Sequence, residues 1–318
     1  EWRAPLRKLL LAMPITAAVI AVAAHAIVGL DWLEAFLLGA LLSPTDPVLS
    51  QSVVTNPLVP RRVRHSLNLE SGLNDGLALA PVIALSAALS TTADDFVWWR
   101  FIVEDISIGL AAGVATGLIA AALLPREDQL REIIPPHQRV LFAIGIVFAS
   151  YGALSYGGHG NAFIDVFVCA ITLGIRRPDL RHHVDEGTKE ITEIVKLGIF
   201  VVFGSIISFG GMLDHGAGAV AILVIALLVA RPIAIWVALV GVRPPFDTQT
   251  KAFMAWFGPK GVATMTYSLF VLGEHVSGGQ EIFDLAALVV LGSILLHGLT
   301  DHPGSAWMGR HAQRTGAV

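Results

Sequence analysis

Charged side chains inside long apolar stretches are the part of this sequence that could do chemistry. Asp46 stands in the segment SPTDP at 43–47, and Glu70 and Asp75 stand in ESGLNDG at 70–76. Lys260 stands in GPKG at 258–261. Each segment interrupts a run of roughly 20 apolar residues, the length that crosses the hydrocarbon core of a bilayer. A charge at that depth is costly and usually serves binding or transport.

Prolines and glycines predict that two of these stretches are broken helices. Pro44 and Pro47 flank Asp46, and each proline removes a backbone donor and obstructs the preceding helical turn. The GPKG segment predicts a second break around Lys260. Two such breaks in corresponding parts of a membrane protein are typical of a transporter binding site. Where the breaks meet, we expect Asp46 and Lys260 to compensate opposing helix dipoles.

The charged residues also have structural interpretations. Asp46 could cap the half-helix that follows it, and Lys260 could pair with Glu70 or with backbone carbonyls alone. On a helix, Ser71 and Asp75 are four residues apart and share one face. Two carboxylates within two turns are an expensive way to pack membrane helices, which favours an ion site over a packing patch.

Two further charges leave several interpretations open. Arg231 precedes a proline in an apolar stretch and indicates an interhelical ion pair or an anchor at the cytoplasmic end. Asp165 could line an ion pathway, or it could pair with Arg231 or with Lys196.

Membrane helices must position these charges. Of 318 residues, 54% are hydrophobic and 14% are charged, whereas a soluble domain has about a quarter charged residues. We therefore predict an all-α integral membrane protein. Its ten candidate spans lie near 9–29, 32–55, 65–90, 105–124, 139–157, 161–175, 190–212, 217–240, 250–273 and 284–300. In the fourth span, glycines at four-residue spacing predict close helix packing: Gly109, Gly113 and Gly117.

The basic residues support this number of spans, because Lys and Arg are retained on the cytoplasmic side during insertion. With ten alternating spans, the loops on one side and the two chain ends collect 17 of the 21 Lys and Arg residues, and the loops on the other side have only Arg100. Both ends are therefore predicted to be cytoplasmic, with the spans in the plasma membrane. No nucleotide-binding, zinc or hydrolase motif is present, so we expect no enzymatic activity, no cofactor and no nucleic-acid partner.

The motif TDP at 45–47, followed by ESGLNDG at 70–76, resembles the core of the monovalent cation:proton antiporter-1 family. That family includes bacterial NhaP-type antiporters and animal sodium/proton exchangers. The glycine-flanked Lys260 and the later pair His297-Gly298 agree, and the resemblance covers nearly the whole chain. Two features depart from the family. The base at position 260 is commonly Arg in the family, and here it is Lys260. The family also usually has more than ten spans, so the ten predicted here fit if N-terminal spans are absent.

The resemblance implies a role for each polar residue of the two motifs. Asp75 corresponds to the essential carboxylate that takes either the cation or the proton. Asp46, Ser71 and Thr45 correspond to residues that complete the oxygen shell of the ion, Thr45 mainly through its backbone carbonyl. Asn74 stands where relatives that move net charge have Asp.

The remaining implied roles are structural. Glu70 corresponds to a carboxylate that pairs with a base on the second broken helix, here Lys260. Independently of the resemblance, Arg231 is expected to be a further supporting residue. The family fold consists of two inverted repeats around a linker helix. We thus expect the rest of the first repeat at 1–104, a linker helix and loop at 105–138, and the second repeat at 139–318. The resemblance also implies a homodimer of the full-length protein.

These observations predict a secondary active antiporter that exchanges a monovalent cation for H⁺ by alternating access. Na⁺ is the first candidate, with Li⁺ and K⁺ as others, because all three accept the same oxygen ligands. With Asn at position 74, one carboxylate exchanges, so we expect electroneutral transport. Two alternatives remain: a Na⁺-coupled symporter of an organic anion on a related fold, and a non-transporting membrane sensor.

Overall fold

The structure is a computed structural model that describes residues 3–46, 51–90, 97–125, 134–157 and 160–315. Pro47, the second proline of the first predicted break, lies outside these residues. Those described form helices and connecting segments, and their only strand-like pairing is a single bridge between Ser90 and Val276. The prediction of an all-α membrane protein is confirmed.

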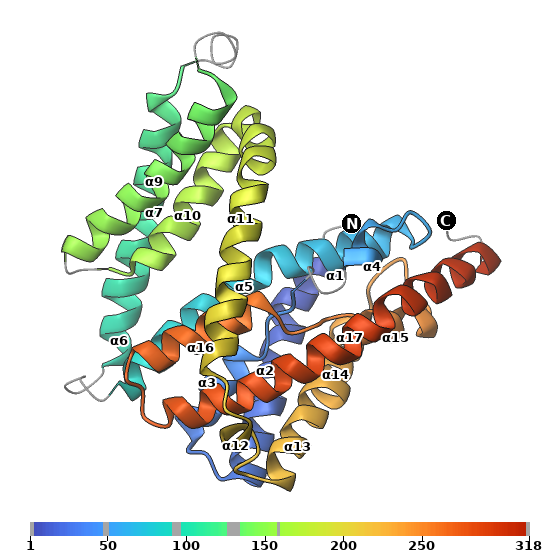
Figure 1. The fold of residues 1–318 in the computed structure, drawn as a ribbon. Coiled ribbons are helices and arrows are strands. Elements are labelled where there is room, and N and C mark those ends of the chain that lie inside the picture. The colour runs from blue at the N-terminus through green and yellow to red at the C-terminus, as the bar shows by residue number, and fades with distance from the viewer. Residues whose placement is uncertain (1–2, 47–50, 91–96, 126–133, 158–159, 316–318) are drawn as a thin grey trace. The chain divides into compact units, whose positions relative to one another are not determined.

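The chain forms two compact units. Unit 1 comprises Glu1–Asp94 and Ile199–Val318, and unit 2 comprises Asp95–Gly198. Within unit 1, helices from the two ends of the sequence pack together, as the blue and orange-to-red ribbons show (Figure 1). The division into these two units does not show whether the two halves of the chain are inverted repeats. The prediction of two inverted repeats around a linker therefore stays a prediction.

Unit 1 contains every residue of the predicted ion site. Its first span is built from α1 (Arg3–Arg7) and α2 (Met13–Ala23), joined and extended by π-helical turns at Lys8–Ala12 and Ala24–Val28. A third π-helical turn, Ala226–Ala230, joins α13 (Ala217–Ile225) to α14 (Arg231–Ala238). The helices of unit 1 are α1 (Arg3–Arg7), α2 (Met13–Ala23), α3 (Trp32–Leu41), α4 (Gln51–Thr55), α5 (Arg61–Leu89), the end of α11 (Pro178–Ile206), α12 (Phe209–Met212), α13 (Ala217–Ile225), α14 (Arg231–Ala238), α15 (Thr248–Trp256), α16 (Val262–Gly273) and α17 (Gly279–Thr315).

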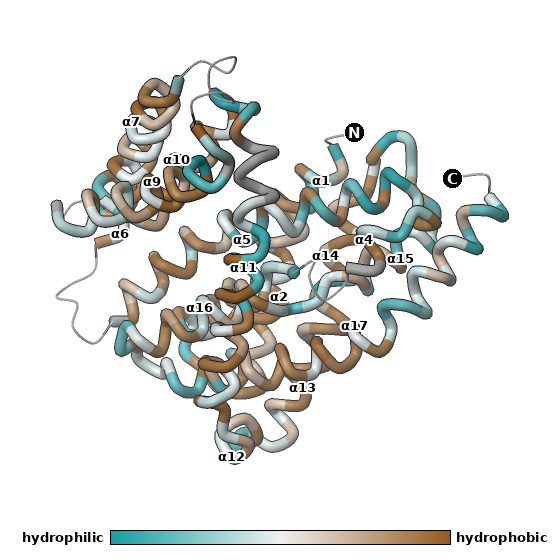
Figure 2. The backbone as a smooth tube through the Cα atoms, turned by 45° about the horizontal axis from the view of Figure 1, so that its top comes forward, coloured by the Kyte–Doolittle hydropathy of each residue, from teal (hydrophilic) through white to brown (hydrophobic). Residues whose placement is uncertain are grey.

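Six helical stretches of the described chain are long and apolar enough to cross a membrane. Figure 2 shows the hydrophobic middle of α17 and its more hydrophilic C-terminal end. The other predicted spans correspond to helices that are shorter, broken or more polar, so the total of ten stays a prediction. The six stretches are Arg3–Val28, Arg61–Leu89, Trp98–Leu123, His137–Tyr156, Ala217–Ala238 and Gly279–Thr315.

Both predicted helix breaks are present in unit 1. Helix α3 ends at Leu41, just before Pro44, and its apolar run is too short to span a bilayer by itself. Helix α15 ends at Trp256, and α16 begins at Val262 after a non-helical segment that contains Lys260. The two breaks leave free backbone groups at the end of α3, at the end of α15 and at the start of α16.

Unit 2 shows the close packing that the glycine spacing predicts. Helix α7 (Ser107–Leu123) packs against α10 (Ala162–Arg176). A Cβ atom at Gly113 would lie 2.5 Å from the Asp165 carbonyl oxygen and 2.7 Å from Cβ of Val168. Side chains larger than hydrogen at Gly109 and Gly117 would also meet α10. Unit 2 further contains α6 (Trp98–Arg100), a π-helical turn at Phe101–Ile106, α9 (Pro136–Gly157) and most of α11.

We predict that Gly113→Ala destabilises the protein, because the added methyl group forces α7 and α10 apart. Gly145→Ala on α9 is the matched control, since a Cβ there has no heavy atom within 4 Å. It should leave stability unchanged or slightly raise it, as Ala favours a helix over Gly. Thermal unfolding in detergent measures both variants. Equal melting temperatures would contradict tight packing at Gly113.

Candidate functional site

The two helix breaks meet, and Asp46 joins them. The Asp46 carboxylate accepts a 2.8 Å hydrogen bond from the backbone N–H of Val262, the first residue of α16. The backbone N–H of Asp46 donates to the carbonyl of Pro259 at 2.8 Å. A Cβ atom at Gly261 would overlap the Asp46 side chain. Asp46 thus caps the half-helix of the other break, where the negative charge is favoured by the helix dipole.

Lys260 makes the reciprocal contact. Its Nζ donates to the carbonyl oxygens of Ser43 at 3.3 Å and Pro44 at 3.1 Å, just beyond the end of α3. The hydroxyl of Thr264 on α16 also donates to the carbonyl oxygen of Leu41, the last residue of α3, at 2.9 Å. The Lys260 side chain is 1% exposed, and a cation is favoured at a helix C-terminus. Of the two pairings that the sequence left open for Lys260, the structure shows the one with carbonyls.

The predicted ion ligands lie beside this crossing. Asn74 on α5 donates through Nδ2 to Thr45 Oγ1 at 2.8 Å, with a longer contact of 3.5 Å to the Thr45 carbonyl oxygen. The hydroxyls of Ser71 and Thr45 are 3.3 Å apart. The Oδ1 atom of Asn74 is buried and has no hydrogen-bond partner among the described residues. The structure therefore brings Thr45, Ser71 and Asn74 together.

Asp75 has an unsatisfied carboxylate oxygen. Its Oδ1 is buried and has no hydrogen-bond partner among the described residues. The Asp46 carboxylate is near enough to interact with it electrostatically. The backbone carbonyl of Asp75 accepts a 2.7 Å hydrogen bond from the hydroxyl of Tyr267 on α16. A buried acceptor without a donor is expensive, and a proton or a small cation would remove that cost.

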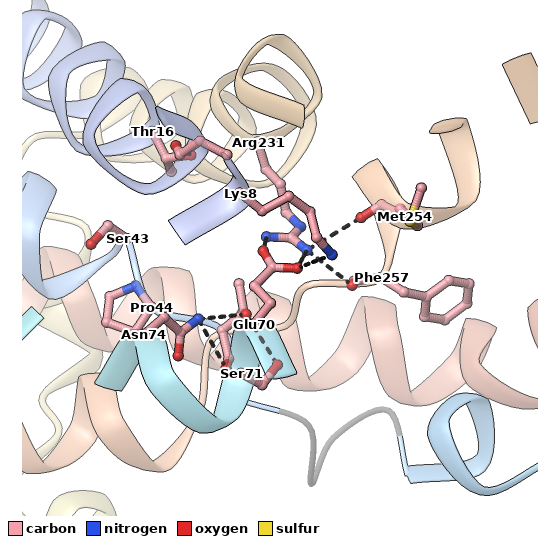
Figure 3. A network of polar contacts seen from close by, with 12 residues as sticks. Lys8, Thr16, Ser43, Pro44, Glu70, Ser71, Asn74, Arg231, Met254 and Phe257 are labelled. Atoms are coloured by element: carbon pink, nitrogen blue, oxygen red, sulfur yellow. Dashed lines mark hydrogen bonds and ion pairs between the residues drawn. The ribbon is translucent and has the colours of Figure 1, made fainter. Parts of the chain in front are cut away.

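Glu70 is held by two cations, neither of which is Lys260. Its Oε2 lies 2.6 Å from Nζ of Lys8, and its Oε1 lies 2.8 Å from Nη1 of Arg231. All three side chains are buried, and Figure 3 shows them converging. The predicted Glu70–Lys260 pair is therefore wrong. The Lys260 ammonium donates hydrogen bonds to the carbonyls just after α3 instead. The partners of Glu70 are Arg231 on α14 and Lys8 in the first span.

Arg231 links this ion-pair cluster to the second break. Its Nη2 donates to the carbonyl oxygens of Met254 and Phe257, both at 3.2 Å, at the C-terminal end of α15. Gly258 is required there, because a Cβ atom would overlap the Arg231 guanidinium. Of the two roles that the sequence left open for Arg231, the structure shows the interhelical ion pair. Arg231 also satisfies free carbonyls of the broken helix.

Comparison with known proteins now identifies the family. The model of the sodium/hydrogen exchanger transmembrane family matches residues 1–305 of the chain. The chain belongs to the sodium/hydrogen exchanger family. This confirms the resemblance found in the TDP and ESGLNDG motifs. Members of this family are transporters rather than enzymes.

Several relatives of this chain are named as antiporters. The K(+)/H(+) antiporter NhaP2 of Shewanella sp. (strain ANA-3) is 26% identical over 284 residues, which are 89% of this chain and 49% of that protein. The K(+)/H(+) antiporter NhaP of Alkalimonas amylolytica is 27% identical over 94% of this chain and 51% of its own length. The Na(+)/H(+) antiporter NhaG of Bacillus atrophaeus is 26% identical over 85% and 52%. The chain spans about half the length of these relatives.

A solved exchanger structure shares the fold. The sodium proton antiporter MjNhaP1 from Methanocaldococcus jannaschii, at pH 8, superposes with a TM-score of 0.78 at 17% sequence identity. The match covers 98% of this chain and 78% of that one. The broken helices and the buried charges therefore belong to a fold that this chain shares with that antiporter.

Two contributors to the candidate site were not predicted. Lys8 contacts Glu70 across 62 positions of sequence, and Tyr267 contacts Asp75 across 192. Lys8 stands among Arg3 and Arg7 at the start of the first apolar run, so it is counted with the cytoplasmic basic residues. The sequence offers no local signal for either contact, because each joins segments that are far apart in the chain.

We predict that Glu70→Ala destabilises the protein by about 3–5 kcal/mol, because it leaves Lys8 and Arg231 buried without their counter-ion. Glu193→Ala is the matched control. Glu193 pairs with Lys196 at 3.2 Å, but its side chain is 61% exposed, and such pairs contribute little. Unfolding in detergent with chemical denaturant compares the two. Similar losses in both variants would show that the cluster at Glu70 is not a structural centre.

Proposed function

We propose that this chain is part of the transmembrane region of a monovalent cation:proton antiporter in which Asp75 takes either the cation or the proton. The observation that carries the proposal is the Oδ1 of Asp75, which lies buried beside Asp46 and has no hydrogen-bond partner among the described residues. Family membership and the names of the relatives support exchange. The choice of Asp75 as the exchanging residue rests on the geometry of the site.

The proposed oxygen shell extends the one implied by the motifs. Hard monovalent cations prefer oxygen ligands, as other hard cations do. Asp75, Asp46, Ser71 and the Thr45 carbonyl supply them in the motif-based prediction. Asn74 Oδ1 is a further candidate ligand, because it is buried and has no partner among the described residues. The amide thus holds Thr45 in place through Nδ2 and offers its oxygen to the ion.

The proposed exchange follows from the cost of an uncompensated charge. An empty Asp75 carboxylate at membrane depth is expensive to carry through a low-dielectric barrier. A bound proton or a bound cation removes that cost, but the two compete for the same oxygens. We infer that only the occupied site crosses the barrier, by alternating access, and that this competition couples the two fluxes.

The substrate and setting are part of the proposal. The relatives are named as K⁺/H⁺ and Na⁺/H⁺ antiporters, so K⁺ and Na⁺ are both candidate substrates, with Li⁺ as a third. We infer a plasma-membrane location from the bacterial relatives. The uneven distribution of basic residues supports cytoplasmic ends for this segment. The family resemblance supports a homodimer of the full-length protein.

Asp75→Asn in the full-length protein is expected to abolish exchange while the protein still inserts and folds, because an amide cannot alternate between a proton and a cation. A pH-sensitive dye inside proteoliposomes, with Na⁺, K⁺ or Li⁺ added outside, measures exchange. Asp214→Asn is the matched control, since Asp214 is exposed in the segment between α12 and α13. Dye responses in the Asp75 variant that equal those of wild type would remove Asp75 from the mechanism.

We expect transport to be electroneutral, because a single carboxylate exchanges one H⁺ for one cation when position 74 is Asn. Reversal potentials in proteoliposomes test this. At zero net flux the cation gradient should balance the proton gradient, and an imposed membrane potential should not move the balance point. A balance point that shifts with the potential would mean that net charge moves and that a second proton carrier takes part.

A further inference from the structure

Among the described residues, two buried acids lie outside the proposed exchange site, and they differ in their hydrogen bonds. Asp165 in unit 2 receives one hydrogen bond on each oxygen, from Ser150 at 2.7 Å and from Thr116 at 3.2 Å. These contacts fit an ionised carboxylate, and they include neither of the basic partners that the sequence left open for it. Asp284 in unit 1 has no such set of donors.

Asp284 is a buried carboxyl with one bare oxygen. It lies in the second turn of α17 and is 7% exposed. Its Oδ2 accepts a 3.1 Å hydrogen bond from the side-chain amide of Gln280, whereas its Oδ1 is buried and has no hydrogen-bond partner among the described residues. An ionised carboxylate can accept about four hydrogen bonds, so a single amide leaves most of its capacity unused. Burying it in that state is costly unless a further group compensates the charge.

The segments around Asp284 contain no Lys or Arg that could compensate this charge. The sequence has neither residue type at 197–230, which contains α12 and α13, or at 261–309, which contains α16 and most of α17. His215, between α12 and α13, reaches α17 but lies 2.7 Å from the carboxylate of Glu281. Its charge, when it is protonated, is therefore matched by Glu281, and the negative charge of Asp284 stays unbalanced.

The break between α11 and α12 lies beside this carboxylate and supplies neutral oxygens. Phe203, in the last turn of α11, packs against Phe283 with ring centres 5.1 Å apart. Beyond the break, a Cβ atom at Gly211 on α12 would lie 2.6 Å from Asp284 Oδ2. The last carbonyls of a helix have no partner inside it, and a cation is favoured at that end. These carbonyls and the Asp284 carboxylate therefore offer oxygen ligands to a cation.

Exposed polar side chains connect the buried carboxylate to the surface. Gln280, one helical turn before Asp284, is exposed, and the side chains of His215 and Glu281 are 30% and 38% exposed. This end of α17 is opposite to the end that contains Arg310, so the distribution of basic residues predicts that it faces the extracytoplasmic side. A cation from that side would meet Gln280 and Glu281 before it reached Asp284.

We propose that Asp284, with Gln280 and the carbonyls at the break between α11 and α12, binds one monovalent cation at the outer end of unit 1. A single carboxylate charge matches a monovalent cation, whereas sites for divalent cations usually have several acidic ligands. On α17, Ser293 accepts a 2.7 Å hydrogen bond from the backbone N–H of Lys260. Asp284 precedes Ser293 by nine residues, so the site lies roughly 13 Å along the helix from the crossing. It does not depend on the role proposed for Asp75.

Binding of radioactive sodium and rubidium ions to the purified full-length protein tests the site, with rubidium in place of K⁺. All variants include Asp75→Asn, so that the proposed exchange carboxylate contributes to none of the measurements. At neutral pH we expect Asp75→Asn to bind a cation and Asp75→Asn/Asp284→Asn to bind one fewer for each chain. Asp75→Asn/Asp214→Asn is the matched control and should bind as Asp75→Asn does. No binding by Asp75→Asn, or equal binding by the two variants that differ at Asp284, would overturn the proposal.

A second pair of variants covers the case in which Asp284→Asn fails to fold. Gly211→Ala in the Asp75→Asn background keeps the Asp284 carboxyl but displaces it, so it should weaken cation binding by about tenfold, as the loss of a charged contact does. Gly210→Ala is the matched control, because a Cβ atom there meets only Ser208 Oγ, at 3.7 Å. Equal affinities in this pair would overturn the proposed site. Stronger competition by Mg²⁺ or Ca²⁺ than by unlabelled Na⁺ would overturn its assignment to a monovalent cation.

Discussion

The reciprocal capping of the two broken helices by Asp46 and Lys260 is the interaction on which the rest of unit 1 depends. Breaking a helix inside a membrane frees amide and carbonyl groups that hydrocarbon cannot satisfy. Here each break supplies the charge that the other needs: Asp46 receives the first N–H of α16, and Lys260 donates to the carbonyls after α3. Each break depends on a side chain of the other to satisfy its free backbone groups, so the two breaks stabilise each other.

The surrounding charges extend the same arrangement. Arg231 donates hydrogen bonds to the carbonyls at the end of α15, and Glu70 and Lys8, both buried, complete its ion-pair cluster. With the free helix ends satisfied by these side chains, Asp75 retains an oxygen that no described protein group satisfies. A frame of paired charges beside a buried acid with an unsatisfied oxygen is what competition between a proton and a cation requires.

The sequence was sufficient for the local features and insufficient for the distant pairings. Proline and glycine positions predicted both breaks, because their effect on a helix is local. Glycine spacing predicted the contact between α7 and α10 for the same reason. The partner of Glu70 could not be predicted, because charge alone favoured Lys260 while the choice depends on which helix faces which. Lys8 and Tyr267 were missed because their contacts join segments far apart in the chain.

The most direct test of the account is proton release on cation binding by the purified full-length protein, without a membrane gradient. In weakly buffered detergent solution, K⁺ or Na⁺ should release about one proton for each cation bound, since both compete for Asp75. Calorimetry in buffers of different ionisation enthalpy counts the protons, and choline serves as the control cation. Cation binding with no proton release would contradict the account, because the two ions would then occupy different sites.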